Sequence, residues 1–418
     1  MNKTNSSGPR LRHLATGLSL MALISVTACQ TSEDEVAPAA DQSGTSQQAT
    51  TGTAEQPPGI TDDSVLFGQS AAFTGPAQEL GIQMRLGIQA AFHEQNEAGG
   101  VHGRQISLTT LDDFYEPDSA YSNTNNLISR QGVFGLIGEV GTPTSRSASR
   151  LATYRGVPFV APFTGAELLR HADLGSVVNL RASYYQETER MVDHLTEDAD
   201  VTRVAVLYQN DSYGAAGFEG VRLALERRGL APVAGGQYQR NTSAVKRAVF
   251  NIVRSEPEAV IMISTYSSAA KAIELIREEI DPIFMAVSFV GSNALAEELG
   301  AGAEGVYVTQ VVPLPGDTGL PVVSSYQAAL KAFDEDAVPG FVSLEGYLAG
   351  RLAIAGLDLC GRDLSRQCFL DAIRNAGSID IEGMVLEYGP SDNQGSDAVF
   401  LTALGSDGSH RIVERLGG

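Results

Sequence analysis

From about residue 65 to residue 311 the chain alternates short apolar runs with longer amphipathic segments. Runs such as 65–71, 105–111 and 157–161 are rich in β-branched and aromatic residues and predict buried strands. The segment 78–97 repeats apolar residues with the helical period and ends before Gly99, which predicts a long helix. Strands that alternate with helices predict a parallel sheet covered by helices on both faces.

The alternation comes in two groups and then stops. A second group of predicted strands follows Arg181, at residues 203–208, 232–237, 259–263, 283–287 and 305–309. After Pro313 the pattern predicts helices at about 320–334, 341–359 and 364–376, and then strands at 384–388 and 398–404. We therefore predict an α/β fold of two doubly wound lobes, with a chain that crosses between them more than once. Such sheets bind ligands beyond the carboxyl ends of their strands, so the lobes should share a cleft.

Residues 138–164 contain the first candidate site. A predicted strand ends at residue 137, a turn rich in hydroxyl groups follows, and a helix is predicted over 145–154. A helix N-terminus carries free N–H groups and partial positive charge, so Thr142, Thr144 and Ser145 predict a site for an anionic or polar group. The alternative is that these hydroxyls only cap the helix.

The N-terminal segment has the pattern of an export signal. Basic residues precede an apolar stretch at 14–26, which is too short for a comfortable membrane span and ends close to Cys29. Small residues before a cysteine resemble the bacterial lipobox, so we predict a signal peptide over 1–28 and a lipid on Cys29. Ordinary signal cleavage with an incidental cysteine is the alternative. Residues 29–61 are polar and poor in large apolar groups, which predicts a disordered tether.

Composition excludes several classes of function. The net charge of −21 lacks the basic surface that nucleic-acid binding requires. No catalytic motif is present, and the six histidines do not recur at metal-ligand spacing, so we expect no enzyme, no cofactor and no metal site. Cys360 and Cys368, eight residues apart in an exported chain, predict a local disulfide, with two free thiols as the alternative.

Several short stretches together resemble the type I periplasmic binding proteins of the leucine/isoleucine/valine-binding group. The matching stretches fall in the family's order over nearly all of 62–413, at residues 73–81, 96–104, 111–118, 138–168, 211–214 and 303–306. The resemblance implies two α/β lobes that are joined by three hinge crossovers and close on a small ligand. We expect lobe I to contain 62–183 and 312–383, and lobe II to contain 184–311 and 384–418.

The resemblance also implies which side chains face the ligand. The turn at Thr142, with Thr144 beside it, and the loop at Phe163 and Thr164 would hold a ligand carboxylate. The opposite lobe would present Tyr213 and Tyr266, and Leu80 would lie near the mouth of the cleft.

The residues that would bind a ligand's ammonium depart from the family pattern. Family members that bind amino acids carry acidic residues near the positions of Ser288 and Gln186, and both positions are uncharged here. A buried ammonium without an anion is poorly compensated, which argues against a plain α-amino acid. Glu187 and Glu189 are close enough in sequence to take this part, and Glu139 could also supply a carboxylate.

These observations predict a monomeric, lipid-anchored solute-binding protein outside the cytoplasm, which captures a small polar or carboxylate-bearing ligand for an ABC permease. An amino acid, an amide or a related compound fits this description. The alternative is a ligand-sensing or regulatory lipoprotein of the same fold that acts on a membrane kinase or a cell-wall synthase.

Overall fold

The computed structural model describes residues 57–417. The predicted signal peptide, Cys29 and most of the predicted tether lie outside these residues. Ile60, at the end of the predicted tether range, is buried and pairs with Val65 in an isolated bridge. Within residues 57–417, no helix combines the length and the apolar character needed to cross a membrane.

Lobe I is built on a parallel sheet with the strand order β2-β1-β3-β4-β5. Its longest pairing joins β1 to β2 in register from Ser64 opposite Gln105 to Ala71 opposite Asp112. Both faces of the sheet are covered, which explains the continuous apolar runs in the sequence. The strands are β1 (Ser64–Ala71), β2 (Gln105–Asp112), β3 (Gly135–Ile137), β4 (Phe159–Val160) and β5 (Val177–Val178).

Close packing of α1 (Gln78–Glu97) against α10 (Phe341–Cys360) forms the centre of the helical layer of lobe I. A Cβ atom on Gly87 would lie 1.9 Å from the carbonyl oxygen of Ser343, so glycine is required where the helices meet. The other helices of lobe I are α2 (Pro117–Ser129), α3 (Thr142–Tyr154), α9 (Pro321–Phe333) and α11 (Arg366–Asn375). A disulfide joins Cys360 to Cys368 between α10 and α11.

Lobe II contains a mixed sheet with the strand order β14-β13-β10-β9-β8-β6-β7. The strands from β6 to β10 are parallel, and β13 and β14 extend the sheet in antiparallel fashion. The strands are β6 (Val204–Gln209), β7 (Ala234–Tyr238), β8 (Ala259–Ile263), β9 (Ile283–Ala286), β10 (Val306–Gln310), β13 (Phe400–Leu404) and β14 (His410–Ile412). The helices are α4 (Tyr184–Asp193), α5 (Ser212–Glu226), α6 (Lys246–Val253), α7 (Tyr266–Arg277) and α8 (Ser292–Leu299).

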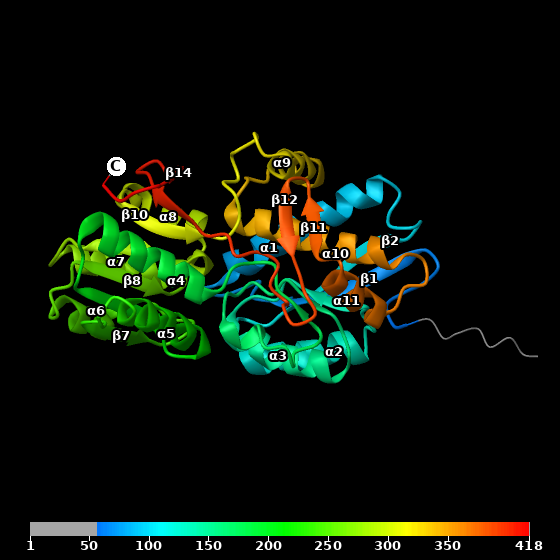
Figure 1. The fold of residues 1–418 in the computed structure, drawn as a ribbon, viewed down its shortest axis with the longest axis horizontal. Helices are drawn as coiled ribbons and strands as arrows, with labels where there is room; N and C mark the ends of the chain where they lie inside the picture. Colours follow the sequence, from blue (N-terminus) through cyan, green and yellow to red (C-terminus); the bar gives the residue numbers. More distant parts are fainter. Residues whose placement is uncertain (1–56, 418) are drawn as a thin grey trace, which may run out of the picture. The chain divides into compact units, whose positions relative to one another are not determined.

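In the described part of the chain, the polypeptide passes between the lobes three times (Figure 1). The crossing segments are 179–183, 311–320 and 388–399. The predicted α/β fold of two lobes is confirmed. The third crossing lies later than the predicted boundary at residue 383, because β11 (Ser378–Ile381) and β12 (Met384–Glu387) form a hairpin beside α10. The strands β5, β11 and β14 are too short to give a periodic signal and were not predicted.

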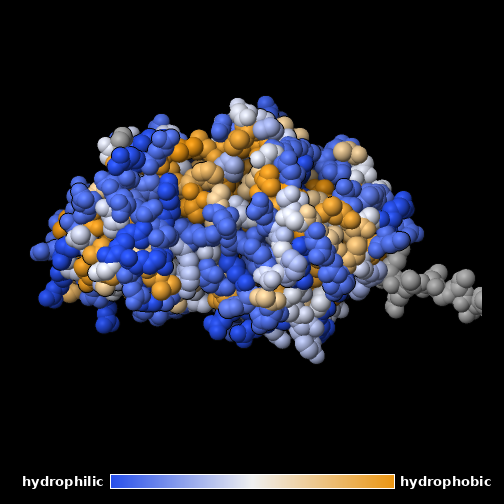
Figure 2. Space-filling model, in the orientation of Figure 1, coloured by the Kyte–Doolittle hydropathy of each residue, from blue (hydrophilic) through white to orange (hydrophobic). Residues whose placement is uncertain are grey.

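Figure 2 shows that hydrophilic residues dominate the visible face of lobe II, whereas the visible face of lobe I carries apolar patches broken by hydrophilic residues. In the interior between the lobes, apolar side chains such as Phe163 and Phe289 pack against each other. There, the strand ends bring together hydroxyl groups, aromatic rings and charged side chains.

Candidate functional site

The N-terminus of α3 is uncapped, because the N-cap residue is a glycine and has no side chain to accept a hydrogen bond from the backbone N–H groups of the first turn. Gly141 occupies the N-cap with φ of +96°, and no side chain caps the helix. A Cβ atom at Gly141 would lie 2.1 Å from Cε2 of Tyr115, so glycine is required at this turn. The hydroxyl of Thr144 donates back to the carbonyl oxygen of Gly141 at 2.9 Å. Thr144 therefore stabilises its own turn, whereas Ser145 Oγ is buried without a hydrogen-bond partner among the described residues.

Thr142 and Thr164 meet at the carboxyl ends of β3 and β4. Their hydroxyl oxygens are 2.7 Å apart, and Thr164 also donates to the hydroxyl of Tyr184 at 3.3 Å. The Phe163 N–H donates to the carbonyl oxygen of Glu139 at 2.7 Å, which holds the two turns side by side. Both threonines are fully buried. The structure thus brings together the two hydroxyls that the sequence assigned to a ligand carboxylate.

An aromatic cluster faces these hydroxyls from both lobes. It consists of Tyr115 and Phe163 from lobe I and Tyr184, Tyr213 and Phe289 from α4 and the strand ends of lobe II. The Phe289 ring centroid lies 4.6 Å from that of Tyr213, 5.4 Å from that of Phe163 and 6.2 Å from that of Tyr115. All five rings are buried. We call the two threonines and the aromatic cluster the interlobe site.

An ionic cluster lies beside the interlobe site, at the first crossing. The guanidinium of Arg181 stacks 4.7 Å from the Phe163 ring centroid and donates to Ser288 Oγ. It also forms ion pairs with Glu187 at 3.7 Å and with Glu345 of α10 at 3.5 Å. Arg181 is fully buried, so the cluster links lobe I, the crossing and lobe II in the interior.

One acidic side chain, that of Glu187, lies next to the positions at which relatives would bind a ligand's ammonium. Glu187 lies one residue after Gln186 and accepts hydrogen bonds from the Ser288 N–H at 2.8 Å and from Thr309 Oγ1 at 2.6 Å. Of the two acids that the sequence offered near Gln186, Glu187 is thus the one that lies against Ser288. Successive helical residues point about 100° apart, so a shift of one position exchanges an inward side chain for an outward one.

Burial alters the protonation of this region. Burial raises the pKa of Glu345 to about 7, although Arg181 opposes the shift. Burial alone would lower the pKa of Arg181, but Glu345 and Glu187 outweigh that effect and raise it. Burial also raises the pKa of Asp113 to about 7 and that of Glu139 well above its ordinary range. Arg181 therefore stays charged beside Glu187 and Glu345, whereas burial favours the protonated form of Glu139.

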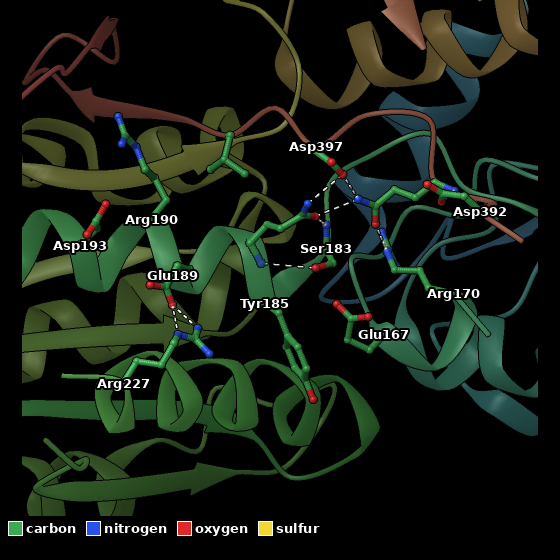
Figure 3. A pocket seen from close by; sticks show the side chains of 13 residues that line it. Glu167, Arg170, Ser183, Tyr185, Glu189, Arg190, Asp193, Arg227, Asp392 and Asp397 are labelled. Atoms are coloured by element: carbon green, nitrogen blue, oxygen red, sulfur yellow. Dashed lines mark hydrogen bonds and ion pairs between the residues drawn. The ribbon is translucent and has the colours of Figure 1, made fainter. Parts of the chain in front are cut away.

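Gln186 itself lies outside the interlobe site. It forms a capping box with Ser183 at the start of α4, and its side chain contacts Asp397 and Gln394 of the third crossing. These residues line an open hollow of about 720 Å³ on the outer side of the crossings. Figure 3 shows Arg170, Glu167 and Asp397 around this hollow, with Glu189 and Arg227 paired along one side. Gln186 thus lies at the first crossing and lines this hollow rather than the interlobe site.

Leu80 and Tyr266 form a separate contact between the lobes. The hydroxyl of Tyr266 accepts from the backbone N–H of Glu79 at 3.5 Å, and Leu80 packs against the positive-φ residue Gly291 of lobe II. Leu80 and Gly291 border a second hollow of about 700 Å³. A further polar contact joins Arg240 and Asn241 of lobe II to Glu116 of lobe I, at 2.6 Å and 2.8 Å. These contacts hold the lobes together around the interlobe site.

Sequence patterns did not indicate Tyr184, Phe289, Arg181 or Glu345. Arg181 is a single charge after a short strand, and Glu345 lies within a long apolar helix. Their position depends on how the lobes meet, which local periodicity does not report. Within residues 57–417, no group of three or more histidine, cysteine or acidic side chains is arranged to hold a metal ion.

Comparison with known proteins identifies the family. A family model described as periplasmic binding protein matches residues 64–409. The crystal structure of a possible leucine/isoleucine/valine-binding protein from Rhodopirellula baltica is 37% identical, with a TM-score of 0.81, over 87% of this chain and 100% of that chain.

More distant relatives agree. Leu/Ile/Val-binding protein homolog 3 of Brucella melitensis is 23% identical over 331 residues, which are 78% of this chain and 87% of that protein. A fatty acid ABC transporter substrate-binding protein from Thermomonospora curvata shares the fold, with a TM-score of 0.79 and 19% identity over 86% of this chain and 94% of that chain. The chain therefore belongs to the type I periplasmic binding protein family, in its leucine/isoleucine/valine-binding group.

Proposed function

We propose that this protein is the lipid-anchored solute-binding component of an ABC importer and captures a small carboxylate-bearing ligand between its lobes. The observation that carries the proposal is the uncapped N-terminus of α3, with the hydroxyls of Thr142 and Thr164 directly beside it. Free N–H groups and a favourable helix dipole suit a carboxylate at this position.

The aromatic cluster supports an apolar body on the ligand. Tyr213 and Phe289 approach from lobe II, whereas the hydroxyl turns belong to lobe I. A ligand that touches both sets of residues would contact both lobes only when they are closed. Such a ligand shifts the equilibrium toward the closed form by its differential affinity for that form. The closed form is then the one that a permease would recognise, and the predicted lipid on Cys29 would keep the protein at the membrane.

The proposal is tested by calorimetric titration of the purified protein with small carboxylic acids, amino acids and amides. We expect Thr164→Val to weaken binding of the preferred ligand by about tenfold or more, because one hydrogen bond to a charged group contributes about 1.5–3 kcal/mol. Thr318→Val, at an exposed loop position, is the matched control and should leave the affinity unchanged.

Two results would overturn the proposal. Unchanged affinity in Thr164→Val would show that the ligand binds elsewhere. No binding by any compound of the three classes would favour the regulatory lipoprotein, in which the interlobe site is filled by the protein's own side chains.

A further inference from the structure

Several buried polar atoms around the interlobe site have no hydrogen-bond partner among the described residues. They include Nη1 of Arg181, the hydroxyls of Ser145 and Ser264, Oε2 of Glu139 and Oε1 of Gln69, whereas Nε of Arg181 is already paired with Glu345. Ser145 lies in the first turn of α3, and the Ser264 carbonyl accepts from the Tyr213 hydroxyl at 3.2 Å. Buried polar groups normally have partners, so these atoms mark positions where a bound molecule completes the structure.

Most of these unpartnered groups can donate a hydrogen bond; the exception is Oε1 of Gln69, which can only accept. A guanidinium has donors only, and a serine hydroxyl can always donate. Burial raises the pKa of Glu139 and so favours the protonated carboxyl group, which has an O–H to donate. The complement of such a set is a molecule rich in acceptor oxygens.

The carboxyl groups near the site are not free to bind a ligand's ammonium. Glu187 already accepts from Ser288 and Thr309 and is paired with Arg181. Asp113 accepts from Ser70 Oγ at 2.9 Å and from the Tyr115 N–H at 2.8 Å. Glu345 lies against the guanidinium at 3.5 Å. An ammonium placed here would meet the Arg181 cation and find no unpaired anion, which is costly in a buried site.

We propose that Arg181 supplies the positive charge of the site itself, so the protein selects organic acids that carry no ammonium group beside the carboxylate. This inference rests on the proposed function, because it concerns the same site. The ligand class is that of 2-oxo, 2-hydroxy or unsubstituted carboxylic acids with an aliphatic or aromatic body. The carboxylate binds at the α3 N-terminus, the body packs on the aromatic cluster, and an acceptor oxygen receives the unused N–H of Arg181.

The test uses ligands that share one carbon skeleton and differ only in the group at C2. The unaltered protein is titrated calorimetrically with the 2-oxo acid, the 2-hydroxy acid, the amino acid and the decarboxylated amine, in one branched aliphatic and one phenyl series. We expect the best acid without an ammonium to bind at least tenfold more tightly than the amino acid, and the amine not to bind.

The variant Arg181→Met gives a second readout. It should weaken binding of the preferred acid by at least tenfold, whereas Arg155→Met, at the exposed C-terminus of α3, should not change it. If Arg181→Met does not fold, the ligand series on the unaltered protein decides the question alone.

The outcomes separate this inference from the proposed function. An amino acid that binds as tightly as the acids, or more tightly, overturns the inference while the carboxylate site stands. Acid binding that is unchanged in folded Arg181→Met also overturns it. No binding in either series removes the carboxylate site, and the inference with it.

Discussion

Arg181 and Glu187 show how much a single buried charge depends on its partner. Both side chains are inaccessible to solvent, and Glu187 receives hydrogen bonds from Ser288 and Thr309 in addition to its ion pair. Removing one member of a buried pair leaves the other uncompensated, which costs far more than the pair itself contributes. The same residues on the surface would matter little, because solvent screens them.

We expect Glu187→Gln to lower the free energy of unfolding by about 2–3 kcal/mol, which is less than the full cost of an unpaired buried charge because Glu345 still pairs with Arg181. Urea unfolding of the ligand-free protein, followed by circular dichroism, measures this change. The control Glu189→Gln affects partly exposed ion pairs with Arg227 and Arg228 and should change stability by about 1 kcal/mol or less. Equal effects of the two substitutions would contradict a stabilising role for the buried pair of Arg181 and Glu187.

At the scale of elements, the helices α10 and α11 are tied at their junction. The disulfide between Cys360 and Cys368 closes a short loop where α10 ends and α11 begins. Ser365 within this loop caps α11 by accepting from the Cys368 N–H at 3.1 Å. The helix α10 also packs on α1 and contributes Glu345 to the ionic cluster. The disulfide therefore helps to fix the position of the helix that carries Glu345.

Replacement of both cysteines by serine should lower the free energy of unfolding by about 2–3 kcal/mol, as expected from loss of a cross-link that closes a short loop. Thermal unfolding with and without a thiol reductant measures the same effect in the unaltered protein. The double variant should be insensitive to the reductant. Equal unfolding temperatures in the oxidised and reduced protein would refute the expectation.

Sequence patterns predicted most of the elements, and the reason is visible in their burial. In α1 the buried residues recur with the helical period, and in β8 every residue is buried, so the apolar pattern of the sequence indicates both elements. The turn at Thr142 was predictable because serine and threonine are preferred where helices begin. Arg181 has no such signal, since its role arises only where the two lobes and the crossing meet. Gln186 and Glu187 are neighbours on α4 that face different surroundings, so the sequence alone could not decide which of the two lies beside Ser288.

At the scale of the whole molecule, buried acids make stability depend on pH. The pKa of Asp113 is raised to about 7 by burial, so the folded protein keeps a proton that the unfolded chain releases near pH 4. Between these two values, a rise in pH favours the unfolded chain, and above pH 7 the penalty is constant. Glu345 acts in the same direction, also with a pKa of about 7.

We predict that the free energy of unfolding falls between pH 5 and pH 7, and that Asp113→Asn makes this decline shallower by up to about 1.4 kcal/mol per pH unit. Urea unfolding at pH 5, 6, 7 and 8 measures both slopes. The exposed substitution Asp173→Asn should leave the slope as in the unaltered protein. Identical slopes in the unaltered protein and Asp113→Asn would contradict the prediction.

The three crossings have a consequence for how the protein is made. The strand β13, near residue 400, pairs with β10, and the helix α10 packs on α1, which lies more than 200 residues earlier in the chain. Neither half of the molecule can be completed while the ribosome is still adding the last fifth of the polypeptide. We therefore expect neither lobe to reach its final packing before synthesis is nearly complete, because the contacts that close each lobe join segments far apart in the sequence.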